Sequence, residues 1–134
     1  MIISVIIYDL LIDKSKSGNT GWLLSFGLLI VSFSIWKQGN ITTSLFTDAV
    51  VLDPFSSFFK QTIILATILV SIVSLYSDEL TKYRKGEFFT LLGIITFGLF
   101  LMVSAIDLII LYISIEIVSI MSFVLAGYLK ENTY

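Results

Sequence analysis

Glu116 is the only charged residue between Leu108 and Leu129, a stretch of twenty-two residues. A helix of that length can cross a bilayer. A carboxylate near the middle of such a helix costs roughly 2.5–3.5 kcal/mol on insertion scales, which favours a functional reason for its presence. Desolvation favours the protonated form of a buried carboxylate, and a nearby cation favours the ionised form. The chemistry that this residue type predicts at this position is therefore proton transfer.

One helical stripe accompanies the carboxylate. At 100° per residue, the residues that share a face with Glu116 are Tyr112, Ser119, Ile120, Phe123 and Gly127. Tyr112 and Ser119 offer hydroxyls within reach of the carboxylate, and Gly127 would let another helix approach closely. Lipid satisfies none of these groups, so we expect the stripe to face a helix bundle. The alternative is a structural carboxylate that is protonated and hydrogen-bonded between helices.

The rest of the sequence supplies the helices that must position Glu116. Hydrophobic residues make up 57% of the chain, charged residues 13%, and the mean hydropathy is +1.00. A soluble domain would carry about 25% charged residues. Four runs of bilayer length, uncharged apart from Glu116, are Ser17–Trp36, Gln61–Ser77, Phe88–Ile106 and Leu108–Leu129. The sequence therefore predicts an all-α, polytopic transmembrane helix bundle in a lipid bilayer, with residues 1–134 forming one domain. The net charge of -2 gives no indication of a nucleic-acid partner.

The N-terminal segment is too short to span a membrane. Met1–Ile12 is apolar except for Asp9, but twelve helical residues rise only about 18 Å. The segment lacks the basic region and cleavage site of a signal peptide. We interpret it as the second half of a transmembrane helix, which gives about five helices, the first short or truncated. The position of Asp9 assigns it no role.

Basic residues predict the orientation. Lys14 and Lys16 follow the first segment, Lys82, Arg84 and Lys85 lie between the third and fourth segments, and Lys130 follows the last. Alternation of the helices places these three clusters on one side, which the positive-inside rule assigns to the cytoplasm. The opposite side has Lys37, with Lys60 a short way into the next helix. We therefore expect a multi-pass protein of the cell inner (plasma) membrane with a periplasmic N-terminus and a cytoplasmic Lys130 end.

The remaining signals concern helix ends and sites. Asp53-Pro54 is a strong helix start after a polar loop, Gln38–Asp53, and Asp107 is the expected cap of the last helix. Lys60 is expected to extend its stem toward the interface, and a role in an ion pathway is the alternative. Cysteine and histidine are absent, which excludes thiolate metal sites, histidine-ligated haem and Ser–His catalysis. We expect no metal and no cofactor bound by this chain.

Several stretches resemble subunit N of bacterial NADH–quinone oxidoreductase, the respiratory complex I, whose mitochondrial counterpart is subunit 2. They are Leu52–Phe55, Glu87–Leu92, Leu101–Leu108, Leu111–Ser119 and Val124–Tyr128. The resemblance covers nearly the whole chain and is most specific in residues 87–128. It implies the N-terminal part of an antiporter-like bundle of about fourteen helices, in which Glu116 matches a proton-pathway glutamate coupled to a lysine outside this chain.

The resemblance also implies an enzyme complex and its partners. The partners are the other membrane subunits of complex I, including the remainder of the antiporter-like bundle. NADH, FMN, iron–sulfur clusters and quinone are expected in other subunits. The family pattern continues past Tyr134, so the chain is interpreted as a split subunit, a remnant or a truncated form. The alternatives are a subunit of a related cation/proton antiporter or membrane-bound hydrogenase, a non-transporting membrane scaffold or assembly protein, and a small independent transporter.

Overall fold

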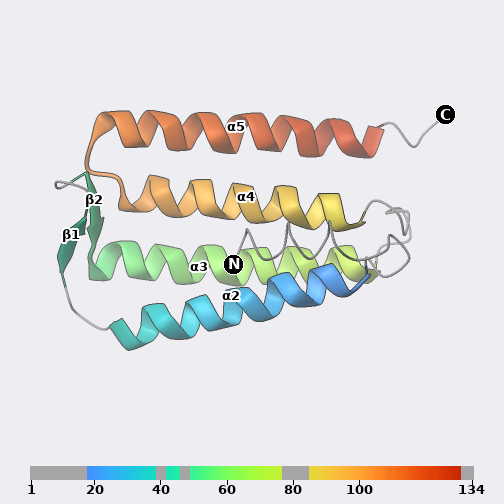
Figure 1. Ribbon diagram of the computed structural model, residues 1–134, viewed down its shortest axis with the longest axis horizontal. Helices are drawn as coiled ribbons and strands as arrows, with labels where there is room; N and C mark the ends of the chain where they lie inside the picture. Colours follow the sequence, from blue (N-terminus) through green and yellow to red (C-terminus); the bar gives the residue numbers. More distant parts are fainter. Residues whose placement is uncertain (1–17, 39–41, 46–48, 77–84, 131–134) are drawn as a thin grey trace.

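In the part of the chain that the structure describes, four helices lie side by side, and a short β-hairpin lies at one end of the bundle (Figure 1). The structure is a computed structural model that describes residues 18–38, 42–45, 49–76 and 85–130. Its elements are α2 (Gly18–Gln38), β1 (Thr43–Leu45), β2 (Val50–Leu52), α3 (Pro54–Tyr76), α4 (Lys85–Ser104) and α5 (Leu108–Lys130). Helices α2, α3 and α4 pack on one another, and α5 packs chiefly on α4. We call the end that carries the hairpin the hairpin end.

The prediction of an all-α transmembrane bundle is confirmed for the described residues. Three helical stretches are long and apolar enough to cross a membrane, namely Pro54–Tyr76, Lys85–Ser104 and Leu108–Gly127, and the apolar part of α2 is shorter. Helix α3 begins at Pro54, as the Asp53-Pro54 signal predicts, so it starts seven residues before the uncharged run Gln61–Ser77 and contains Lys60. Helix α4 begins at Lys85, three residues before the uncharged run Phe88–Ile106, so Lys85 lies in a helix and not between the segments. The predicted first segment, with Asp9, lies outside the described residues.

The prediction of a polar loop between α2 and α3 is wrong in part, because this region contains the hairpin. Strands β1 and β2 are antiparallel, with Ser44 opposite Val51. Val50 also forms an isolated bridge with Ala105, and the Ile106 N–H donates to the Ala49 carbonyl at 3.0 Å. The hairpin therefore holds the turn between α4 and α5, which is the start of the helix that carries Glu116.

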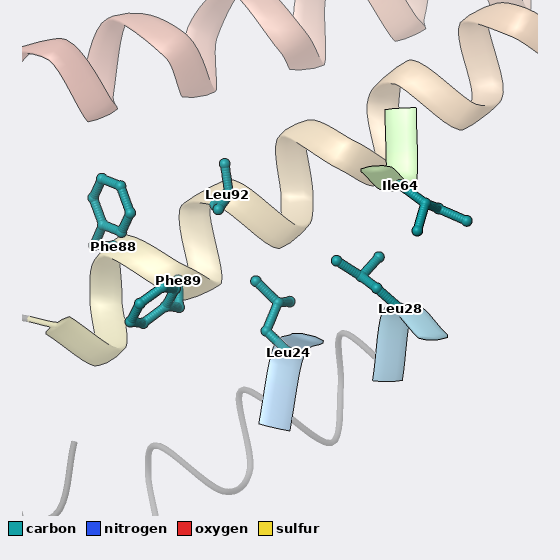
Figure 2. Close-up of a cluster of buried hydrophobic side chains, with 6 residues drawn as sticks. All are labelled: Leu24, Leu28, Ile64, Phe88, Phe89 and Leu92. Carbon is teal, nitrogen blue, oxygen red and sulfur yellow. The ribbon is translucent and has the colours of Figure 1, made fainter. Parts of the chain in front are cut away.

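Apolar side chains from α2, α3 and α4 form the core (Figure 2). The buried cluster consists of Leu24, Leu28, Ile64, Phe88, Phe89 and Leu92. The rings of Phe88 and Phe89 meet edge to face with centroids 5.5 Å apart. Many large apolar side chains also lie on the outside, which is the arrangement that a lipid surrounding favours.

The buried face of α3 is mostly polar. Its members are Ser56, Lys60, Ile64, Thr67, Ser71 and Ser74. Hydroxyls link this face to the neighbouring helices, because the oxygens of Ser25 and Ser71 lie 2.9 Å apart and those of Thr67 and Thr96 lie 3.1 Å apart. In a membrane, where lipid is as apolar as the core, such interhelical hydrogen bonds and close packing replace hydrophobic association.

Candidate functional site

Helix α5 is fixed at its N-terminus by the predicted cap. Asp107 Oδ1 accepts the Ile109 N–H at 3.0 Å, and the Asp107 carbonyl accepts the Leu111 N–H at 3.0 Å. This satisfies a donor that the first turn would otherwise leave without a partner. The cap lies directly after the residues that the hairpin binds, so α5 starts from a fixed point at the hairpin end.

A close contact with α4 sets the rotation of α5 about its own axis. Gly98 lies so close to α5 that a Cβ built on it would be 2.8 Å from Val118 Cγ2 and 3.1 Å from Ile117 Cγ2. Ser114, one turn before Val118, is fully enclosed and donates to the Ile110 carbonyl at 2.6 Å. The face of α5 that carries these three residues therefore rests on α4.

Glu116 lies on the opposite face of α5. It is 200° from both Ser114 and Val118 around the helix, and its side chain is exposed. Tyr112 is 65% exposed and Phe123 78% exposed. The expectation that this stripe packs against a helix bundle is not met by the described helices, because Gly98 brings the other face of α5 onto α4.

The polar groups around Glu116 make no network within the described residues. Neither Tyr112 nor Ser119 hydrogen-bonds to the carboxylate, and no described cation pairs with it. A Cβ at Gly127 would meet no atom within 4 Å, so the close helix approach expected there does not occur among the described helices. The structure thus brings the predicted stripe onto one face without supplying a proton donor or acceptor to it.

Lys60 lies on the inward face of α3, and the expectation that its stem extends toward the interface stays a prediction. Its side chain is only 6% exposed and belongs to the buried face of α3. The sequence placed Lys60 a short way into this helix but did not identify the face on which it lies. The signal that could have placed it is its spacing from Ser56, Thr67, Ser71 and Ser74, which repeats every three or four residues and marks one face.

Asp53 directly precedes α3, and its charge interacts with that of Lys60. Its carboxylate accepts the Ser56 N–H at 2.7 Å, which is the predicted N-cap contact. This hydrogen bond, with further contributions from the Ser56 hydroxyl and the charge of Lys60, holds the pKa of Asp53 below its usual value of 3.8. The ionised carboxylate therefore stabilises the start of α3.

We expect Asp53→Ala to lower the free energy of unfolding by about 1 kcal/mol at neutral pH, since it removes an N-cap. Asp53→Asn should cost little there, because asparagine caps equally well. The pKa of Asp53 is lower in the folded state than in the unfolded state. The stabilisation that its charge provides is therefore complete above pH 3.8 and is lost as the pH falls through the pKa of the folded state. Denaturant titrations in micelles at several pH values would check this, and an Asn variant as acid-sensitive as the native chain would contradict it.

Comparisons with known proteins come from sequence. The chain is 34% identical over 130 residues to NADH-quinone oxidoreductase subunit N 2 of Chloroherpeton thalassium. This match covers 94% of this chain and 25% of that protein. It is 34% identical over 122 residues to NADH-quinone oxidoreductase subunit N of Heliobacterium modesticaldum, covering 89% of this chain and 26% of the relative. It is 29% identical over 136 residues to F(420)H(2) dehydrogenase subunit N of Methanosarcina mazei, covering 96% of this chain and 27% of the relative.

These relatives are much longer than the chain, which spans about a quarter of their length. No protein-family profile matches the chain. No solved structure matches it either. The matches cover 89% to 96% of the chain, so the aligned segment reaches into all four described helices.

Proposed function

Because this chain is related over nearly all of its length to part of subunit N of NADH-quinone oxidoreductases, we propose that it is a membrane-embedded component of such a complex and that Glu116 transfers protons there. The complex would couple electron flow from NADH to quinone with proton translocation, and its redox centres would lie in other subunits. The chain would contribute part of a proton path and no redox chemistry.

The observation that carries the proposal is the position of Glu116 on the outer face of α5, where no described group satisfies it. Charged residues within membrane spans almost always face protein or a water-filled cavity. We therefore infer that the remainder of a larger bundle covers this face and brings a lysine to Glu116. Approach of that cation would favour the ionised carboxylate and release a proton, and its withdrawal would favour proton uptake.

Two further features of the proposal concern the electron donor and the orientation. The relatives include a subunit of an F(420)H(2) dehydrogenase. The sequence of this chain is thus similar to subunits of complexes whose names give different electron donors. The basic residues place the hairpin end in the periplasm and the opposite end in the cytoplasm, in the plasma membrane. At the opposite end, Lys85 Nζ donates to the Leu75 carbonyl at 3.2 Å and so caps the end of α3.

Purification from native membranes tests the assignment to a complex. We expect an affinity-tagged chain, extracted with a mild detergent, to co-purify with a large assembly that oxidises NADH with a soluble quinone. An assembly that the chain enters only transiently, with none of it in the active fractions, would instead support the scaffold or assembly interpretation. A chain that migrates alone would contradict the proposal outright.

A further inference from the structure

A second group of polar side chains lies at the hairpin end of α3, inside the bundle and away from the outer face of α5. Asp53, Ser56 and Lys60 are spaced by three and four residues, so they share one face of the helix. Ser56 is 1% exposed and Lys60 is 6% exposed. Helix side chains lean toward the N-terminus, which directs the Lys60 stem toward Ser56 and the cap.

Ser104 of α4 lies at the same depth as Lys60. Helices α3 and α4 are antiparallel (Figure 1), and the hydroxyls of Thr67 and Thr96 meet at 3.1 Å. From this contact, Lys60 lies seven residues along α3 toward the hairpin end, and Ser104 lies eight residues along α4 in the same direction. At a helical rise of 1.5 Å per residue, both are about 10–12 Å from the contact along the helix axis. Ser104 is 5% exposed, and its hydroxyl is enclosed without a hydrogen-bond partner among the described residues.

The hydrogen-bonding capacity here exceeds what the described side chains use. A lysine ammonium has three donors, and Lys60 makes no hydrogen bond to a described residue. Gln61, its neighbour, is engaged at both ends with Ser32, at 2.6 Å and 2.8 Å. Asp53 directs Oδ1 to the Ser56 N–H. Leaving an enclosed hydroxyl and the ammonium of a buried lysine without partners is costly, and water is the usual partner of such groups.

We propose that Lys60 and Ser104, with Asp53 and Ser56, form a hydrated cation site that takes up water from the hairpin side of the membrane. Water supplies the partners of the ammonium and the Ser104 hydroxyl, and the Asp53 carboxylate balances the lysine charge. The site holds a positive charge within the α2–α3–α4 bundle and is separate from Glu116, whose helix contacts α4 through its other face.

The hydration ends at Ile64. This residue is the next one along the same face of α3 and is 2% exposed, within the apolar cluster that also contains Leu28 and Leu92 (Figure 2). Beyond it, Thr67 and Thr96 bond to each other and to carbonyls of their own helices. The site is therefore closed toward the opposite side of the membrane.

Single cysteines test the proposal, because the chain has none of its own. Ser104→Cys and Thr96→Cys, each in the full chain in its native membranes, would be treated with a small anionic methanethiosulfonate added to the hairpin side. We expect Ser104→Cys to react about tenfold faster or more, since the reactive thiolate forms where water is present. Equal rates at the two positions would overturn the proposal.

The contribution of Lys60 is tested in the same background. Adding Lys60→Met to Ser104→Cys should slow the reaction severalfold, and Lys60→Arg should preserve it. Lys37→Met is the matched control, because Lys37 is an exposed lysine near the same end. An unchanged rate in the Lys60→Met variant would show that the lysine is not part of a hydrated site. If that variant fails to fold, the comparison of Ser104→Cys with Thr96→Cys still decides.

Discussion

Replacing Glu116 by glutamine is expected to reduce proton transport by the assembled complex by roughly tenfold or more, because a positioned acid–base group contributes about 10²–10⁴-fold to proton transfer. Glutamine keeps the shape of the side chain and cannot release a proton. It also lowers the cost of placing a charge within the membrane, so α5 should insert and pack at least as well. Proton uptake into inverted vesicles, measured together with NADH oxidation and with the amount of complex, would separate transport from assembly.

The matched control is Glu87→Gln. Glu87 is an exposed carboxylate in the first turn of α4, at the opposite end of the bundle from the hairpin. It carries the same chemical change outside the inferred path, so proton transport should be unaffected. Normal proton transport at normal turnover in the Glu116→Gln complex would refute the proposed role. A complex that fails to assemble in this variant alone would support the structural interpretation of the carboxylate.

The sequence predicted the helices well because the strongest signals in it are long uncharged runs and helix caps. Asp53-Pro54 and Asp107 mark helix starts by hydrogen bonds within one turn, which depend on no distant residue. Glu116 was likewise identifiable, because a single charge in a span is visible in one dimension. Its stripe does share one face of α5 in the structure.

Other features depend on partners far along the chain. The hairpin has strands of three residues, whose pairing and bridge to Ala105 are tertiary contacts that local propensity does not reveal. The inward face of α3 was missed because lipid and core are both apolar, so hydrophobic periodicity does not distinguish them. Only the spacing of the serines and threonines marks that face.

The direction in which Glu116 points was the hardest to predict. The stripe itself follows from helix geometry, but the sequence does not say which face of α5 rests on α4. That choice is made by Gly98, whose missing side chain lets Ile117 and Val118 come close. A glycine in a hydrophobic run carries no sign of its partner.

Gly98→Leu should therefore destabilise the packing of α5 on α4 by about 1–3 kcal/mol, the usual cost of overpacking. Even a Cβ at this position would be 2.8 Å from Val118 Cγ2, and the β-branched side chains of Ile117 and Val118 have few rotamers with which to move away. The free energy of unfolding of the chain in micelles, from titration with a denaturing detergent, measures the effect.

Gly127→Leu is the matched substitution on the face that carries Glu116. A Cβ there meets nothing within 4 Å, and leucine is the better helix former by up to about 1 kcal/mol, so the isolated chain should be unaffected or slightly stabilised. Equal losses in the two variants would show that Gly98 is not a special contact. In the assembled complex the comparison tests the outer face as well, since a leucine at position 127 should disturb assembly only if other helices cover that face, as the proposed role of Glu116 requires.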